Sequence, residues 1–271
     1  MALPVAIQLF SLRNEMANDV VGTLKAVKAM GYDGVEFAGL WGKTPEEMKE
    51  LLNEIGLCPV SAHVPYPELI ADPETVAKTY KAIGCKHVVI PWLDPEERPD
   101  GKNFGEFLAN VKRIGEVMHA NGMNLHYHNH EFEFVPFENG ECSFDALYAE
   151  TTPEILKMQL DCCWCNVAGK RSEDYLKKYA NRCPLLHLKD YVGQKQENMY
   201  NLIGKEQIEV ETRAFEFRSV GQGKVDFDSI LAVAEDCGVE WLIVEQDSPT
   251  PDKTSMECAE LSRLYLKSKN F

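Results

Sequence analysis

Four residues that can bind a divalent metal stand at the ends of four apolar, strand-like segments in the second half of the chain: His128, Asp161, His187 and Glu245. Mixed imidazole and carboxylate ligands suit manganese, cobalt, zinc, iron or magnesium. An ion held in this way polarises a carbonyl oxygen and stabilises the enediolate that forms when the neighbouring carbon loses a proton. These residue types therefore predict metal-assisted proton transfer.

The four residues carry different weights as ligands. Glu245 ends the apolar run 241–244, and a carboxylate placed there needs a cation or hydrogen-bond donors. Asp161 could instead cap a following turn. His128 belongs to a period-two series with His126 and His130, so all three share one face of a strand. His130 on the same face and Glu131, which directly follows it, compete with His128 for the place of fourth ligand.

Short apolar segments alternate with longer amphipathic ones along the whole chain. The expected strands are residues 5–9, 34–37, 59–62, 87–90, 124–128, 157–161, 185–188 and 241–245. Helical periodicity covers residues 18–30, 103–120 and 226–237, and Thr44 before Pro45 predicts a further helix start. Several helical segments end on glycine just before the next strand, which is typical of left-handed helix termini.

Eight strands alternating with helices over 271 residues predict a single (β/α)₈ barrel that covers residues 1–271. A doubly wound open sheet is the alternative, but no G-x-G-x-x-G follows the first strand. Residues 190–224 are too long for a simple connection, and 208–217 alternate like a strand. We therefore expect an extended loop or hairpin after strand seven, where long barrel loops usually serve the active site.

The composition narrows the class of protein. Apolar residues make up 45% of the chain and charged residues 26%, as in a globular enzyme, and no apolar run is long enough to span a membrane. The net charge of −15 argues against nucleic acid as a partner. The first residues lack the features of a signal peptide, so a cytoplasmic location is expected. Cys162, Cys163 and Cys165 lack paired zinc-site spacing and are interpreted as buried, reduced thiols.

Five motifs make the chain resemble the xylose-isomerase-like TIM-barrel superfamily of sugar isomerases and epimerases, which also includes inosose dehydratases and AP-endonuclease-type nucleases. They are the segments Gly31–Glu36, Leu160-Asp161, His187-Leu-Lys-Asp190, Val220–Asp226 and Ile243-Val-Glu245. The resemblance spans essentially the whole chain. It implies the barrel fold, one divalent metal and a small sugar or cyclitol as substrate, and it does not identify that substrate.

Two positions depart from the pattern of the resembled epimerases. His128 stands where they carry a strand-five glutamate, and Trp164 stands where they carry a histidine three residues after the strand-six aspartate. In those epimerases, two glutamates on opposite sides of the substrate exchange the proton. The loss of one of them weakens the case for two-base epimerisation. The segment Tyr127–Glu131 instead resembles a subgroup labelled sugar phosphate isomerases.

The remaining roles follow from the strand ends. Glu245 is the first candidate for the catalytic base, and Glu131, His130 and Lys189 are candidates for a second group. Lys189 could instead form a solvated pair with Asp190. We expect the pocket that binds the substrate to include Gln8, Glu36, His63, Trp92, His130 and Trp164, although Glu36 and His63 could equally make buried structural hydrogen bonds.

Isomerisation or epimerisation is the first functional hypothesis, and a lyase that eliminates an adjacent hydroxyl or glycosidic oxygen is the alternative. Both start from the same enediolate. No phosphate cradle lies near strands seven and eight, which favours an unphosphorylated sugar or cyclitol. A nuclease and a non-catalytic sugar-binding barrel are the rival classes. The residues leave the choice among Mn, Co, Zn and Mg open, as well as whether the chain forms a homo-oligomer.

Overall fold

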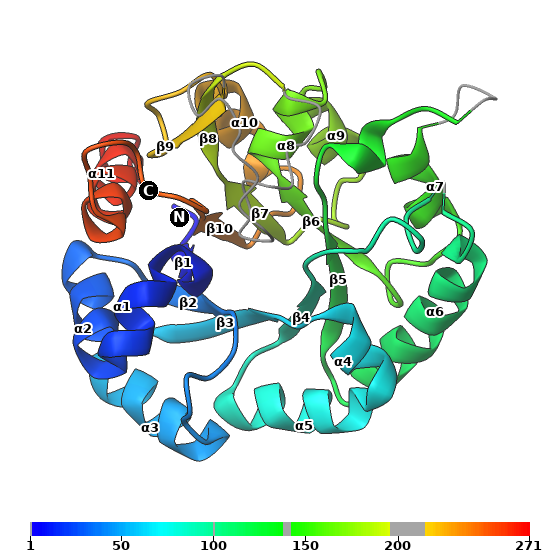
Figure 1. Ribbon diagram of the computed structural model, residues 1–271, viewed down its shortest axis with the longest axis horizontal. Helices are drawn as coiled ribbons and strands as arrows, with labels where there is room; N and C mark the ends of the chain where they lie inside the picture. Colours follow the sequence, from blue (N-terminus) through cyan, green and yellow to red (C-terminus); the bar gives the residue numbers. More distant parts are fainter. Residues whose placement is uncertain (1, 100, 138–141, 196–214) are drawn as a thin grey trace.

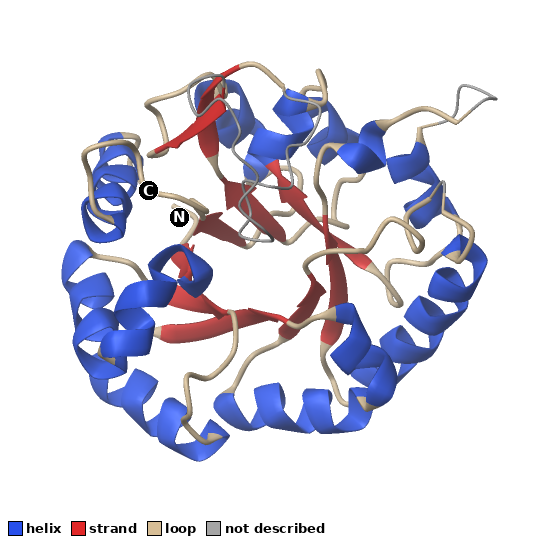
Figure 2. Cartoon of the chain, in the orientation of Figure 1, coloured by secondary structure: helices blue, strands red, loops and turns tan. Residues whose placement is uncertain are grey.

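Eight parallel strands close into a barrel in the computed structural model, which describes residues 2–99, 101–137, 142–195 and 215–271. Around the ring, neighbouring strands pair in the order β1-β10-β7-β6-β5-β4-β3-β2. Figures 1 and 2 show the strands at the centre and the helices outside them. The predicted (β/α)₈ barrel is confirmed. The barrel strands are β1 (Val5–Gln8), β2 (Gly34–Phe37), β3 (Cys58–His63), β4 (His87–Ile90), β5 (Asn124–His128), β6 (Lys157–Asp161), β7 (Leu185–Leu188) and β10 (Trp241–Val244).

The helices follow from amphipathic segments with definite start and stop signals. Thr44 and Glu47 form a capping box at the start of α3, and Gly31 and Gly84 end α2 and α5 with φ angles of 94° and 114°. The α-helices are α1 (Arg13–Asn18), α2 (Val20–Met30), α3 (Pro45–Ile55), α4 (Tyr66–Ala71), α5 (Pro73–Ile83), α6 (Phe104–Ala120), α7 (Ser143–Ala149), α8 (Cys162–Val167), α9 (Ser172–Lys178), α10 (Phe227–Ala234) and α11 (Ser255–Ser268), with short 3₁₀ turns η1 (Leu9–Leu12) and η2 (Phe132–Phe134).

A two-stranded antiparallel ribbon follows β7, as expected. It consists of β8 (Asp190–Gly193) and β9 (Phe215–Arg218), with Asp190 opposite Arg218. Part of the predicted strand, residues 208–214, lies outside the described residues. The ribbon is seen at the upper edge of the barrel in Figure 1.

The Asp190 carboxylate anchors this ribbon to the loop that leads into α10. It accepts hydrogen bonds from the backbone N–H groups of Tyr191, Gly221, Gly223 and Val225, at 2.7–3.2 Å. A Cβ atom at Gly223 would lie 2.2 Å from Asp190 Oδ1, so this turn requires glycine. Of the two alternatives left open for Lys189, the solvated pair with Asp190 is wrong, because the Asp190 carboxylate is fully buried and bonded to the backbone.

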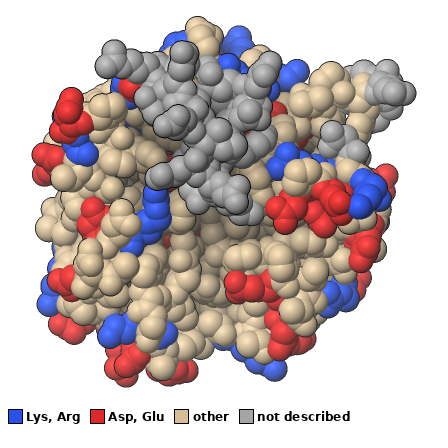
Figure 3. All heavy atoms as spheres, viewed as in Figure 1, with Lys and Arg blue, Asp and Glu red and all other residues tan. Residues whose placement is uncertain are grey.

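The free cysteines and the charged surface are those expected of a globular protein with reduced thiols. All nine cysteines are free, and Cys162, Cys163 and Cys165 are fully buried. On the face shown in Figure 3, charged side chains lie mainly around the rim. Among the described residues, every helix is too short or too polar to cross a bilayer.

Close packing at the start of β2 predicts a measurable cost for one added methyl group. A Cβ atom at Gly34 would lie 2.7 Å from the Cys58 carbonyl oxygen and 2.7 Å from Val60 Cγ2, whereas nothing lies within 4 Å at Gly105 in α6. Gly34→Ala should lower the free energy of unfolding by about 1–3 kcal/mol. Gly105→Ala, the matched control, should leave it equal or raise it. Equal effects in urea denaturation would contradict this packing.

Candidate active site

The four predicted ligands converge at the end of the barrel where the strands' carboxyl ends meet. One ligand atom from each of His128, Asp161, His187 and Glu245 lies within 4.8 Å of the others, and all four side chains are buried. Neighbouring strands β5, β6, β7 and β10 supply them, so register alone brings the residues together; Asp161, for example, pairs with His187. We call this group the four-residue cluster.

The two carboxylate oxygens of Asp161 have different surroundings: one caps a helix and the other faces the cluster. Oδ1 accepts a hydrogen bond of 2.9 Å from Trp164 N and so caps α8. Oδ2 is buried, has no hydrogen-bond partner among the described residues and lies 3.9 Å from His128 Nε2. Burial raises the pKa of Asp161 to about 7, although Lys189 acts in the opposite direction. The predicted capping role and the predicted ligand role are therefore compatible, since they use different oxygens.

Gln159 determines which nitrogen of His128 faces the cluster. The Gln159 amide N–H donates to Glu36 Oε2 at 2.6 Å, because a carboxylate can only accept. Its Oε1 atom must then accept from His128 Nδ1 at 3.0 Å and from His63 Nε2 at 2.7 Å. With the proton on Nδ1, the lone pair of His128 lies on Nε2, which faces Asp161. Burial holds the pKa of His128 well below its usual range, so the ring is neutral, as a metal ligand must be.

His187 lies between two carboxylates. Its Nε2 is 2.7 Å from Glu36 Oε1, and its Nδ1 is 3.2 Å from Glu245 Oε2. Burial opposes the charged ring, but Glu36 and Glu245 outweigh it and raise the pKa of His187 to about 10. The shorter contact places the retained proton on Nε2, which leaves Nδ1 as the nitrogen that can be given to a cation. A carboxylate behind a ligand histidine is a common arrangement in metal sites.

Glu36 is the centre of this network. It accepts from Gln8 Nε2 at 2.8 Å and Ser61 Oγ at 2.6 Å, in addition to Gln159 and His187, and His63 Nε2 lies 3.0 Å away. Burial alone would raise the pKa of Glu36, but His63 and His187 lower it well below its usual range. Gln8 and Glu36 were predicted to touch the substrate; both are fully buried and bonded to each other, which favours a positioning role.

Lys189 places a buried positive charge beside the cluster. Its Nζ atom lies 3.0 Å from Glu245 Oε2, 2.8 Å from Asp247 Oδ2 and 4.0 Å from Asp161 Oδ2, and its side chain is 2% exposed. Burial lowers its pKa, but Asp247 and Glu245 outweigh that effect, so the amine stays protonated. The ammonium also lies over the rings of Trp164 and Phe217, 5.4 and 5.3 Å from their centroids.

Aromatic side chains form a wall beside the cluster. His130 makes edge contact with Trp92 at 4.8 Å between centroids, stacks on Phe132 at 5.4 Å and lies 5.5 Å from Trp164. Trp164 in turn stacks on Phe215 of the ribbon. The structure therefore groups the predicted residues Trp92, His130 and Trp164 on one side of the site. Glu131 lies outside the four-residue cluster, beside η2.

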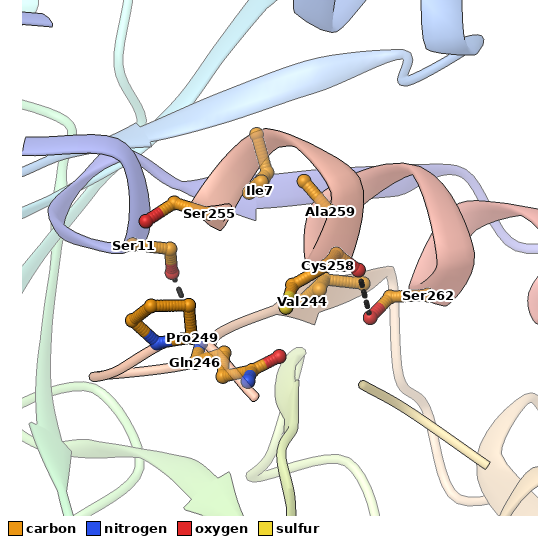
Figure 4. A pocket seen from close by; sticks show the side chains of 9 residues that line it. All are labelled: Ile7, Ser11, Val244, Gln246, Pro249, Ser255, Cys258, Ala259 and Ser262. Carbon is orange, nitrogen blue, oxygen red and sulfur yellow. Dashed lines mark hydrogen bonds between the residues drawn. The ribbon is translucent and has the colours of Figure 1, made fainter. Parts of the chain in front are cut away.

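Sequence reasoning missed two residues of the network. Gln159 precedes Asp161 by two positions and Asp247 follows Glu245 by two, so the period-two rule that grouped the strand-five histidines would have found Gln159 and drawn attention to Asp247. A small void shown in Figure 4 lies elsewhere, between β1, β10 and α11. Its volume of about 10 Å³ is too small for a sugar.

The residues of the cluster fit a divalent metal. The donor set is two imidazole nitrogens and two carboxylates. Among the described residues, Asp161 Oδ2 has no hydrogen-bond partner although it is buried. Hydrogen bonds orient both histidines so that one nitrogen of each faces the cluster. In a second group, His63, His128 and His187, one ring nitrogen of each residue also lies within 4.8 Å of the others. This group fits a metal less well, because His63 Nε2 is already bonded to Gln159 and Glu36.

Comparison with known proteins agrees with this fold. Residues 24–264 match the family described as xylose isomerase-like TIM barrel, and the chain belongs to that family. An inosose dehydratase of Geobacillus kaustophilus is 24% identical over 270 residues, covering 90% of this chain and 85% of the relative.

Two solved structures share the fold. A sugar phosphate isomerase/epimerase from Parabacteroides distasonis superposes with a TM-score of 0.79 at 21% identity, covering 99% of this chain and 94% of the other. A xylose isomerase-like TIM barrel protein from Mycobacterium smegmatis, in complex with magnesium, gives a TM-score of 0.70 at 14% identity, covering 98% and 96%.

Removing the charge of Glu36 should weaken metal binding without removing a ligand. Glu36→Gln withdraws the acceptor that orients His187, and losing such a partner typically costs about 10–100-fold in metal affinity. Calorimetric titration with Mn²⁺ measures the change. Ser61→Ala removes one donor and keeps the carboxylate, so its effect should be much smaller. Equal affinities for wild type and Glu36→Gln would contradict the positioning role.

Metal binding should become stronger as the pH rises. A carboxyl group with a pKa of about 7 is mostly protonated at pH 6 and ionised at pH 8, and only the ionised Asp161 can bind a cation. Apparent affinity for Mn²⁺ should therefore rise by about tenfold or more from pH 6 to 8, with proton release that calorimetry in buffers of different ionisation enthalpy can count. Affinity that stays constant or falls over this range would contradict the environment described for Asp161.

Proposed function

We propose that this single-domain barrel is a metal-dependent carbohydrate lyase that eliminates water from a cyclic polyol ketone. The observation that carries the proposal is His128, an imidazole on β5 where two-base epimerases place their second glutamate. Gln159 is bonded to its Nδ1 and Asp161 faces its Nε2, which supports a ligand role for His128 over the role of an opposing base. Proton removal then falls to one carboxylate.

The proposed elimination needs only one carboxylate, Glu245, on one side of the substrate, because the same group can remove the proton and return it. The four-residue cluster would hold a divalent metal, which would supply the Lewis acid that acidifies the C–H beside the ketone. Glu245 takes this proton, the C–O bond to the adjacent hydroxyl breaks as the C=C bond forms, and Glu245 returns the proton so that water leaves. Lys189, 3.0 Å from the same carboxylate, keeps Glu245 ionised before the reaction. The pKa of Glu245, which burial alone would raise, is well below its usual range because of Lys189 and His187.

The named relative supports elimination, since it is an inosose dehydratase, and the aromatic wall suits the apolar face of a polyol ring. Isomerisation or epimerisation is the second candidate, favoured by the name of the Parabacteroides structure. A nuclease is disfavoured by the net charge of −15. The metal site, the substrate contacts and a cytoplasmic location stay predictions.

Incubation with inosose in D₂O separates the two candidates. The manganese-loaded protein should form the hydroxy-enone that loss of one water produces, which is the enol tautomer of a 1,2-diketone, and ultraviolet absorbance and proton NMR follow its formation. Deuterium exchange into recovered cyclitol or sugar ketones without any loss of water would contradict the lyase and favour the isomerase.

Glu245→Gln should abolish elimination while the barrel stays folded, because the variant lacks the proton acceptor. Glu260→Gln on α11, an exposed position outside the site, is the matched control and should keep wild-type activity. Circular dichroism establishes that both variants fold. Substantial turnover by Glu245→Gln would overturn the assignment of the base.

A further inference from the structure

A second cavity, of about 550 Å³, opens at the opposite end of the barrel, where the strands begin. Its lining residues start β4, β5 and β6 or stand in the segments just before β4, β7 and β10. This volume is within the roughly 300–1,000 Å³ range of small-molecule pockets. The cavity is lined by Lys86, His87, Asn124, Lys157, Asn181, Pro184, Gly238, Val239 and Glu240, and we call it the lower cavity.

An apolar layer separates the lower cavity from the active site. Ala6, Leu185 and Ile243 lie two positions before Gln8, His187 and Glu245, so they occupy the next layer down inside the barrel. These side chains pack with Val60 and Val89 into one buried cluster. A ligand of the lower cavity therefore has no direct contact with the reacting atoms above.

The charge of the lower cavity is opposite to that of the chain as a whole. Two lysines and one glutamate line it, whereas the chain carries a net charge of −15. Within the part of the chain that the structure describes, neither Lys86 nor Lys157 has a carboxylate within 4.0 Å. Two ammonium groups without a paired carboxylate, on one cavity, favour an anion.

Neutral hydrogen-bonding groups stand between the lysines. The amides of Asn124 and Asn181 can donate, and His87, only 4% exposed, forms part of the wall. His126 Nδ1 must donate to the Met158 carbonyl at 3.2 Å, so His126 Nε2 accepts from His87 Nδ1 at 2.9 Å. This bond fixes the orientation of the His87 ring, so this part of the wall loses little freedom when a ligand binds.

We propose that the lower cavity is a binding site for a small phosphorylated metabolite, distinct from the active site. Paired lysines with amide donors are suited to the spread charge of a phosphate group, for which lysine acts as a point charge. The cavity is larger than a lone phosphate ion, which leaves room for the organic part of a phosphate ester. The proposal does not depend on the reaction at the other end of the barrel.

Calorimetric titration of the full, metal-loaded chain with glycerol 1-phosphate and, separately, with inorganic phosphate tests the site. Lys86→Gln/Lys157→Gln should weaken binding of the ester at least tenfold. Lys49→Gln/Lys112→Gln removes the same charge from exposed lysines on α3 and α6 and should leave the affinity unchanged. Glu240→Gln should strengthen binding by about two- to fivefold, because it removes the carboxylate that lines the cavity.

The other outcomes are distinct. Equal losses in the two double variants would mean that only the net charge matters, and the site would be rejected. Folding defects in Lys86→Gln/Lys157→Gln, with Glu240→Gln failing to strengthen binding, would assign the lysines to stabilisation of the nearby helix ends and would also reject it. Tighter binding of inorganic phosphate than of the ester would contradict the metabolite. Because Glu245→Gln leaves the lower cavity intact, loss of ester binding in that variant would place the ester in the active site instead.

Discussion

The buried carboxylate of Glu36 is the interaction on which the site depends. A charged group in the barrel interior is tolerated only if its oxygens receive hydrogen bonds or opposite charge. Glu36 receives them from β1, β3, β6 and β7, that is, from strands on opposite sides of the ring. The same bonds that stabilise this charge also fix His187 and Gln159, so closure of the barrel and orientation of the histidines in the four-residue cluster have one physical cause.

Acidic side chains outnumber basic ones among the buried residues at the mouth of the barrel. Asp161, Glu245 and Asp247 lie around a single ammonium, that of Lys189. Three buried carboxylates and one cation leave excess negative charge, and His187 takes up part of it by holding a proton between Glu36 and Glu245. A divalent cation bound by the four-residue cluster would supply the same compensation more completely.

Much of this arrangement could be predicted from the sequence because the barrel converts strand ends into neighbours. Residues 185–188 were expected as a strand and form β7, and the four ligands follow from what ends each strand. Glu36 was noticed for the same reason, but its role depends on Gln159, which lies 123 positions away in the chain. No local pattern indicates which of two amide or imidazole nitrogens faces a partner across the barrel. The sequence also left open a solvated pair between Lys189 and Asp190. In the structure Lys189 points toward Asp247 at the cluster, whereas Asp190 accepts hydrogen bonds from the backbone beside the ribbon.

Anomalous diffraction from crystals soaked in Mn²⁺ would show whether the four-residue cluster binds metal, because it locates the ion without reference to activity. We expect one strong peak about 2.0–2.2 Å from His128 Nε2, His187 Nδ1 and carboxylate oxygens of Asp161 and Glu245, with the proton on His187 Nε2 still shared with Glu36. A peak held by His63, His128 and His187, or no peak with Lys189 still between Glu245 and Asp247 at saturating Mn²⁺, would contradict it.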